Sequence, residues 1–516
     1  MNVKVVRCIC LFLILLTLIG TATACKSKEN VPSGQTSDVT LPPVEPDAPS
    51  EQEAYRPEKE DLDNYTFRMV IDDAGLQVNQ RWFTYIEDDG MDVLDQAFYD
   101  RNMFLQDYFN INIEFKRIGT YQMVETMRKS LMGHDDFADI TMSVAGHVLK
   151  SAATEGLAMD LNKLSPLNLD ASYWDQRIQQ EYSINNMLFT LEGDYNCYDD
   201  LSTYVVYFNN YLYEQFDYPD KYGSLYDHVR DGTWTQSLLM EMVKGVAEED
   251  NSNIAPGKRW GMYAQDPLPY IYYLATGNHG LVHEEDGSLS LVFDDRTVYN
   301  ITETLLSDAI KAVAINEDVV VIESCVNAGT ATWPDFFEGF ATDKAMFYTG
   351  IMVDFQYFSK DMKSLYGMLP IPKYNSEQEE YYSWCSSQCH LPLVIPKTAY
   401  DHAETTAKIT EAMAYFSKYP FSSKGMTVVE AEYEWLMLNS VCRTYDDLDM
   451  AKIVFASKAY DLDFATNLTG ITWLTQEHCR SGSLDRFSSN LRGIQSKALG
   501  QLTEFLRDVK DNNLSD

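Results

Sequence analysis

Residues that could carry out catalysis are present in this sequence of 516 residues, but not at the spacings that catalytic and metal sites use. The chain contains neither of the two glycine-rich nucleotide-binding motifs, G-x-G-x-x-G and G-x-x-x-x-G-K-[ST]. It also contains no G-x-S-x-G motif of serine hydrolases and no H-E-x-x-H motif of zinc proteases. His279 and His283 lie four residues apart beside Glu284, a spacing that could bind a metal ion on a helix. Gly277 and Gly280 argue against a helix there, so we predict solvated loop histidines, no metal site and no cofactor.

Carboxylates and thiols are abundant, but neither group marks a reactive site. Residues 88–92 (DDGMD) and 446–449 (DDLD) are acidic enough for calcium, yet neither matches an EF-hand loop, and the second indicates a helix N-terminus. With 78 Asp and Glu in the chain, no chosen pair of carboxylates is evidence for glycoside hydrolysis. Cys385 and Cys389 lack a second pair at zinc-finger spacing, so we expect buried or free thiols and predict no catalytic residue.

Aromatic side chains are the most informative group for binding. The chain has eight Trp and 34 Tyr, several of them in predicted loops. Flat rings with polar edges suit the C–H faces of sugars, and neighbouring acids or amides can bind the hydroxyl groups. Most single aromatic side chains are expected to belong to the core, so it is the set as a whole that favours a sugar.

Charge excludes some partners. Asp and Glu outnumber Lys and Arg by 78 to 40, which gives a net charge of −38. A charge of this sign repels phosphate backbones and anionic lipid headgroups, so we expect no nucleic acid partner. The apolar share of 45% is enough to form a large core.

The N-terminus resembles a bacterial lipoprotein signal. Lys4 and Arg7 precede an apolar stretch that is too short to span a bilayer, and small residues then lead to Cys25. We predict a signal peptide over residues 1–24, palmitate on Cys25 and an acidic Ser/Pro-rich tether over residues 25–61. The alternative is an ordinary secretory signal with an incidental cysteine.

The elements that must position a site follow an α/β pattern. Residues 65–71, 111–117 and 137–142 are predicted strands, separated by helices over 92–109 and 121–132 and followed by a further helix. This alternation is typical of a parallel sheet covered by helices.

The pattern restarts after residue 187. Strands are predicted at 187–191, 203–208, 344–349, 366–372 and 391–396. Helices are predicted at 235–249, 300–315 and 402–418, and the C-terminal third reads as helical.

A series of segments resembles the family 1 extracellular solute-binding lipoproteins of ABC transporters, in a long form typical of anaerobic Firmicutes. The segments include DDFADITM with GLAMDL, STYVVYFNNYLYEQF, GTWTQSLLMEMVKGV, FFEGFATDKAMFYTGIMVDF, YGMLPIPKYN and LPLVIPKTAYDHAETTAKITEAMAYF, in this order. The resemblance implies a two-lobed α/β fold of the periplasmic-binding-protein type (type II), with a ligand cleft between lobes joined by crossing segments. We predict lobe 1 at 62–196 and 388–432, and lobe 2 at 200–385 and 440–516.

Ligands of parallel α/β sheets bind beyond the carboxyl ends of the strands, so residues that follow predicted strands or lie at crossings are the candidates. Relatives that stack sugars often have an aromatic residue where Met352 stands, and Met does not stack in the same way. The predicted ligand-binding residues are Trp82, Tyr85, Ser143, Gly146, His147, Tyr195, Tyr198, Asp199, Gly350, Met352, Trp384 and Trp473.

The expected function is capture of a solute, a sugar or short glycan, for delivery to the permease subunits of an ABC importer. The protein would be a monomer, anchored by lipid to the extracellular face of the cell membrane, and would catalyse no reaction. Two alternatives remain: an extracellular carbohydrate-active enzyme, and a surface glycan-adhesion protein without a transporter.

Overall fold

The computed structural model describes residues 55–72, 91–119, 121–248, 257–293, 295–422, 425–439 and 441–513. The predicted signal peptide, Cys25, Trp82 and Tyr85 lie outside the described residues. Within the described residues, no helix combines the length and the apolar character needed to cross a bilayer.

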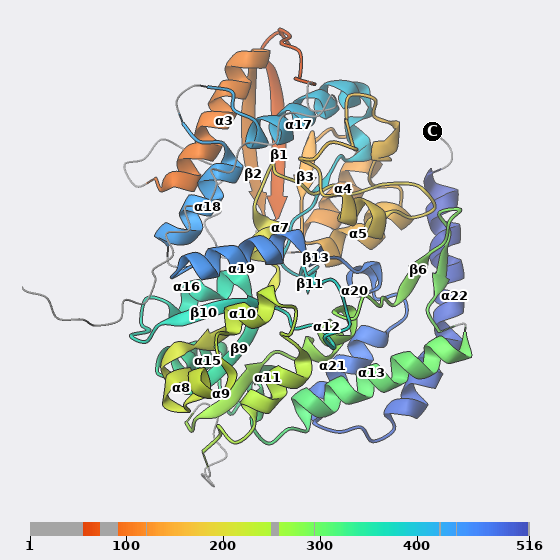
Figure 1. Cartoon of the computed structure of the whole chain (residues 1–516). Coiled ribbons are helices and arrows are strands. Elements are labelled where there is room, and N and C mark those ends of the chain that lie inside the picture. The colour runs from red at the N-terminus through yellow and green to blue at the C-terminus, as the bar shows by residue number, and fades with distance from the viewer. Residues whose placement is uncertain are drawn as a thin grey trace, which may run out of the picture. The chain divides into compact units, whose positions relative to one another are not determined.

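The first sheet has four strands in the order β12-β3-β1-β2. Its strands are β1 (Tyr65–Asp72), β2 (Ile111–Ile118), β3 (Ile140–Met142) and β12 (Leu393–Val394). β1 pairs in parallel with β2 and β3, and β12 pairs antiparallel to β3 (Figure 1). The three N-terminal strands confirm the predicted parallel sheet, which a segment about 250 residues later in the chain completes.

Local sequence explains the helix between β1 and β2. Asp92 caps α3 (Val93–Phe109) by accepting hydrogen bonds from the backbone of Leu94 and Asp95, and Asp95 completes a capping box. The helix buries residues at helical spacing along one face. Asn110, in the left-handed conformation with φ 49°, ends the helix directly before β2.

The second sheet has five strands in the order β10-β4-β9-β5-β8. Its strands are β4 (Tyr204–Asn209), β5 (Trp260–Ala264), β8 (Val319–Val321), β9 (Ala345–Ile351) and β10 (Tyr366–Pro370). β5 is parallel to both β8 and β9, whereas β4 is antiparallel to β9 and to β10. Two small sheets pair β6 (Leu281–His283) with β7 (Leu289–Leu291), and β11 (Ser383–Trp384) with β13 (Lys458–Ala459).

Helices surround these sheets. On the side of the first sheet lie α4 (Met123–Gly133), α5 (Ala145–Thr154), α17 (Ala403–Lys418) and α18 (Val428–Leu438), with short 3-10 turns at Leu161–Lys163 and Lys397–His402, whereas α6 (Gln176–Tyr182) contacts β13. The others are α7 (Tyr198–Leu201), α8 (Asn210–Gln215), α9 (Tyr218–Tyr222), α10 (Leu225–Arg230), α11 (Gln236–Val243), α12 (Leu268–Leu274), α13 (Arg296–Ala314), α14 (Ile322–Asn327), α15 (Trp333–Ala341), a 3-10 turn at Met352–Asp354, α16 (Phe355–Phe358), α19 (Tyr445–Ala456), α20 (Leu462–Thr466), α21 (Ile471–Ser481) and α22 (Phe487–Asn513).

The C-terminal helices contact both sides of the molecule. α19 packs on β10 of the second sheet, whereas α20 and α22 pack on α5 beside the first sheet. The side-chain amides of Asn512 and Asn513 donate to the carbonyls of Thr154 and Ala153. The segment from 440 to 516, assigned above to lobe 2 alone, therefore also contacts the first-sheet side.

Two predicted elements differ from the structure. Residues 187–191 were predicted to form a strand, but they make only isolated bridges. Leu191 pairs with Leu393 at a single position, and Met187 pairs with Ile184. The helix predicted over 235–249 ends at Val243, because Lys244 is extended and Gly245 has φ 79°. The sequence patterns above also omitted β5 and β8.

Candidate functional site

The parallel strands of the second sheet end in polar residues that lie side by side. Gln265 and Asp266 follow β5, Glu323 comes shortly after β8, and Asp354 follows β9. Since β9, β5 and β8 are neighbours in the sheet, their carboxyl ends share one edge. This edge is the place where parallel α/β sheets bind ligands.

Hydrogen bonds join four of the side chains at this edge, which we call the strand-end cluster: Tyr204, Gln265, Tyr348 and Asp354. The Tyr204 hydroxyl donates to Gln265 Oε1 at 2.6 Å, and the Tyr348 hydroxyl donates to Asp354 Oδ2 at 2.6 Å. Gln265 Nε2 lies 3.4 Å from the same Asp354 oxygen. A Cβ on Gly350 would lie 2.2 Å from that oxygen, so glycine leaves the space that the cluster needs.

Burial controls the protonation of the acids at this edge. Burial raises the pKa of Asp354 to about 7, although Tyr348, the Ile351 amide and Gln265 donate hydrogen bonds to it. Burial and the neighbouring Asp266 raise the pKa of Glu323 to about 8. The Arg480 guanidinium pairs with Asp266 at 2.5 Å. Near neutral pH, Asp354 and Glu323 are therefore partly protonated. The protonated carboxyl can donate a hydrogen bond, and the ionised one can only accept.

The first sheet ends in a second polar group. Ser143, after β3, donates to Asp72 Oδ2 at 2.7 Å at the end of β1. The His147 ring lies 4.1 Å from the ring of Tyr121, and burial lowers the His147 pKa against the effects of Asp72 and a hydrogen bond with Gln388. Gly146 has no room for a side chain, since a Cβ would lie 2.2 Å from Gln388 Nε2.

Cys389 connects the two polar groups. It directly follows Gln388, and burial together with the Asp354 carboxylate raises its pKa, to about 11. Burial, Asp354 and Cys389 in turn raise the pKa of Tyr357, whose ring stacks on Phe337 with the ring centroids 4.7 Å apart. Gln356 Nε2 has no hydrogen-bond partner within the described part of the chain. The carboxyl ends of both sheets thus contribute to one site.

The residues that are half-buried or exposed at this site offer donors, acceptors and a ring to a ligand. They are Gly146, His147, Gln356, Tyr357, Gln388 and Cys389. Amide and imidazole groups beside a tyrosine ring can bind hydroxyl groups and stack on a C–H face.

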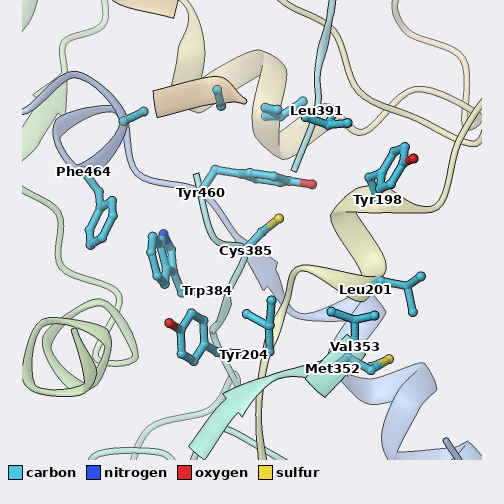
Figure 2. Packing of buried hydrophobic residues seen from close by; sticks show 14 of the residues in the cluster. Tyr198, Leu201, Tyr204, Met352, Val353, Trp384, Cys385, Leu391, Tyr460 and Phe464 are labelled. Atoms are coloured by element: carbon cyan, nitrogen blue, oxygen red, sulfur yellow. The ribbon is translucent and has the colours of Figure 1, made fainter. Parts of the chain in front are cut away.

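Four predicted site residues have buried side chains that pack in the core. Tyr195 has no exposed surface, and its hydroxyl faces the carbonyls of Leu191 and Leu391. Tyr198 and Met352 are also buried. Trp384 packs between Tyr204 and Phe464, with ring centroids 5.2 Å and 4.1 Å away (Figure 2). Loop-like composition did not reveal burial, because these rings lie where segments distant in sequence meet.

The remaining predicted site residues lie in different parts of the structure. Ser143, Gly146 and His147 lie together at the end of β3, and Gly350 lies beside the strand-end cluster. Asp199 lines a separate cavity. Trp473 is 65% exposed and lies on α21, not in a loop.

Sequence reasoning missed Gln265, Asp354, Gln356 and Gln388. The first two were missed because β5 was not recognised and the β9 strand was ended at residue 349. The signal that could have found Gln265 is the short apolar run WGMYA, followed by a polar pair and a proline.

The histidine and cysteine expectations have mixed outcomes. His279 is half-buried and paired with acids: its Nδ1 lies 3.4 Å from Asp461 Oδ2 and 3.5 Å from Glu181 Oε2. Burial alone would lower its pKa, but the two carboxylates raise it to about 9. Cys385 and Cys389 are free thiols, as predicted, and so are the four other cysteines of the described residues.

Comparison with known proteins supports the fold. A cyclo/maltodextrin-binding protein solved with maltotetraose matches at a TM-score of 0.50 and 12% identity, over 86% of this chain and 96% of that chain. A cyclic alpha-maltosyl-1,6-maltose binding protein from Arthrobacter globiformis matches at a TM-score of 0.50 and 9% identity, over 87% and 100%. No family model and no curated protein matches the chain. The chain therefore has the two-lobed fold of these binding proteins.

Proposed function

We propose that this protein captures a sugar or short glycan outside the cell and delivers it to the permease subunits of an ABC importer. The proposal rests on one observation: Gln388 packs on Gly146 after β3 and the adjacent Cys389 lies near Asp354 after β9, so residues that follow parallel strands of both sheets approach the same short segment. The two solved proteins that share the fold bind maltotetraose and a cyclic maltosyl-maltose according to their descriptions, which agrees with an oligosaccharide ligand.

Capture would use closure of the two lobes around the ligand. A ligand that contacts both sheet edges binds the closed arrangement better and selects it. We propose the division given above, with 62–196 and 388–432 in lobe 1, and 200–385 and 440–516 in lobe 2. The pairing of β12 with β3 supports the return of the chain to lobe 1.

Calorimetry with maltotetraose, preceded by a thermal-shift screen of mono- and oligosaccharides, tests the proposal. A ligand that binds only the folded state must raise the melting temperature. Gln356→Ala and Gln388→Ala should each weaken binding of the best ligand about tenfold, the value of a lost hydrogen bond with a buried partner. Gln501→Ala, an exposed glutamine on α22, is the matched control. If no sugar shifts the melting temperature, the sugar proposal is wrong.

The same samples separate binding from catalysis. Chromatography of each sugar after incubation with the protein should show unchanged sugar. A cleaved product, lost in the Gln356 and Gln388 variants, would favour the carbohydrate-active enzyme instead. Two permease genes beside the gene for this protein would favour transport over glycan adhesion.

We also propose that Cys25 carries the lipid that holds the protein at the membrane. The supporting pattern is the charged and apolar N-terminal stretch that ends at this cysteine. Cys25→Ala should release the protein to the medium or leave it unprocessed. A variant that stays in the membrane fraction at the original level would contradict the anchor.

A further inference from the structure

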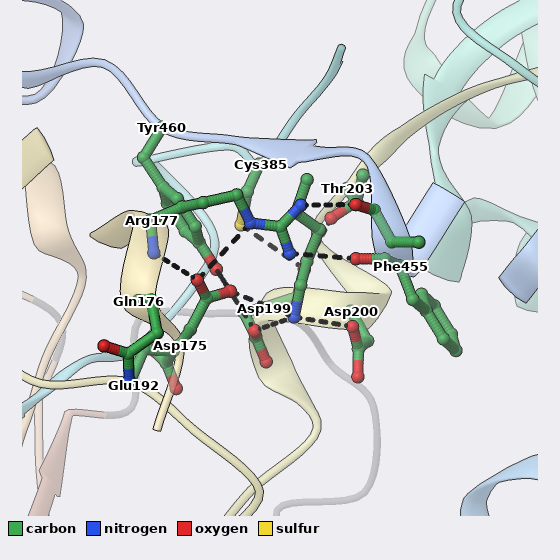
Figure 3. A network of polar contacts seen from close by, with 12 residues as sticks. Asp175, Gln176, Arg177, Glu192, Asp199, Asp200, Thr203, Cys385, Phe455 and Tyr460 are labelled. Carbon is green, nitrogen blue, oxygen red and sulfur yellow. Dashed lines mark hydrogen bonds and ion pairs between the residues drawn. The ribbon is translucent and has the colours of Figure 1, made fainter. Parts of the chain in front are cut away.

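A cavity of about 330 Å³ lies apart from the strand-end cluster, between the segments 172–177 and 193–200, α18 and the end of α19. None of the residues of the strand-end cluster lines it. Its volume falls at the lower end of the range of small-molecule sites. Figure 3 shows part of its polar wall, where Asp175 and Asp199 converge.

Carboxylates outnumber cations in this wall. Five acids line the cavity against two basic residues: Asp175, Asp194, Asp199, Asp200 and Glu432 against Arg177 and Lys458. Lys458 Nζ pairs with Asp199, lies 2.8 Å from Asp200 Oδ1 and lies 3.6 Å from Asp175 Oδ2. Arg177 donates from its guanidinium to the carbonyls of Phe455 and Ala456, and its Nε lies 3.5 Å from Asp175 Oδ1, so it pairs with one of the five acids.

Groups behind the wall do not remove the excess of acid. Lys418 lies 3.5 Å from Asp194, and the Tyr460 hydroxyl lies 3.0 Å from Asp175 and 3.2 Å from Asp199. Glu192 adds a further buried carboxyl, bonded to Asn196.

The Glu432 carboxyl is hydrogen-bonded to the Cys197 thiol, but one of its two oxygens, Oε1, has no partner among the described residues. The side chain lines the cavity from α18, and the residue is only 5% exposed. A buried carboxyl oxygen that lacks a donor costs free energy, which a ligand N–H group would recover.

Aromatic rings complete the walls. Trp174, Tyr433 and Phe455 line the same cavity as the acids. Ring faces attract organic cations, and a primary ammonium group has three N–H donors for carboxylates. The described residues include no group of side chains able to hold a metal ion. We propose that this cavity is a second binding site, one that takes a primary alkylammonium group, with the nitrogen at Glu432 and the alkyl chain along the rings.

The protonation of the acids in the cavity wall predicts how binding of the cation should depend on pH. Burial raises the pKa of Asp194 to about 6, that of Asp200 to about 7 and that of Glu432 well above its usual range. The empty cavity therefore retains protons at neutral pH. A cation that binds there favours the ionised carboxyls and displaces protons, so its affinity should rise with pH between about 5.5 and 8.

Calorimetry with n-butylammonium chloride tests the site, with 1-butanol as the neutral control of equal length and sodium chloride to match ionic strength. We expect butylammonium to bind with proton release, measured from heats in two buffers that differ in ionisation enthalpy. Glu432→Gln should weaken this binding at least about tenfold, the value of a charge-assisted hydrogen bond. Glu434→Gln, an exposed residue on the same helix, should leave it unchanged.

Equal binding of butanol and butylammonium, or no binding of butylammonium at millimolar concentration, overturns the proposal. Binding that Glu432→Gln and Glu434→Gln weaken equally would also overturn it, because such binding would reflect net charge alone. If Glu432→Gln fails to fold, the butanol comparison and the proton release of the unaltered protein decide. The test uses no sugar, so its outcome is independent of the proposed transport function.

Discussion

The protonation of Asp354 can be tested directly, because replacing it with asparagine keeps its shape and removes its titration. Burial raises the pKa of Asp354 to about 7, against 3.8 for an exposed aspartate. Between about pH 4 and pH 7 the unfolded chain loses this proton while the folded protein keeps it. The free energy of unfolding should therefore fall as pH rises through this window. About three pH units at about 1.36 kcal/mol per unit amount to on the order of 4 kcal/mol.

The variant Asp354→Asn has no titrating carboxyl at this position, so its free energy of unfolding should not fall for this reason as the pH rises. Its free energy of unfolding should be close to that of the unaltered protein near pH 4 and should exceed it increasingly toward pH 7. Urea unfolding at half-unit pH steps measures the difference between the two proteins, which cancels the titration of other groups. Asp361→Asn, an exposed aspartate seven residues further on, is the control and should show a constant difference. A constant difference for Asp354→Asn as well would refute the reasoning.

Three further substitutions test the core and the ion pairs. Tyr195→Ala should lower the free energy of unfolding by about 3–5 kcal/mol, because the ring is fully buried. If the melting temperature of the ligand-free variant is unchanged, Tyr195 is not a core residue and is again a candidate for ligand binding. Lys458→Met should cost about 3–5 kcal/mol in urea unfolding at pH 7, because it leaves Asp199 and Asp200 buried without their cation; a loss below about 1 kcal/mol would contradict the pairing. Gly350→Ala should lower the free energy of unfolding by about 1–3 kcal/mol and weaken sugar binding, because its Cβ would press on Asp354 and Tyr348. The control Gly500→Ala, on the open face of α22, should not lower the free energy of unfolding.

The first sheet could be read from the sequence because its signals are local. The strand at 65–72, the capped helix that follows and the strand from 111 each carry their own pattern within about 45 residues. The acidic start of α19 was also readable, because Asp446 and Asp447 lie in the first turn after the Thr444 cap.

The second sheet was harder to predict for a physical reason. β5 and β8 are short, and β8 is an uninterrupted apolar run without the alternation that marks a half-buried strand. Their places in the sheet depend on pairing with segments far away in the chain, such as Trp260 with Ala345. No local pattern encodes such a pairing.

The sequence by itself determined the α/β class, the absence of known catalytic motifs and the acidic character of the chain. It also predicted that residues after β3 would lie at a strand end. Only the tertiary structure decided which polar residues meet, because Asp72 meets Ser143 and Gln265 meets Asp354 through the order of the strands in each sheet and not through spacing along the chain. It also decided that Tyr195 and Trp384 are fully buried and Gln356 is half-buried, since burial depends on what packs against a side chain, which composition does not reveal.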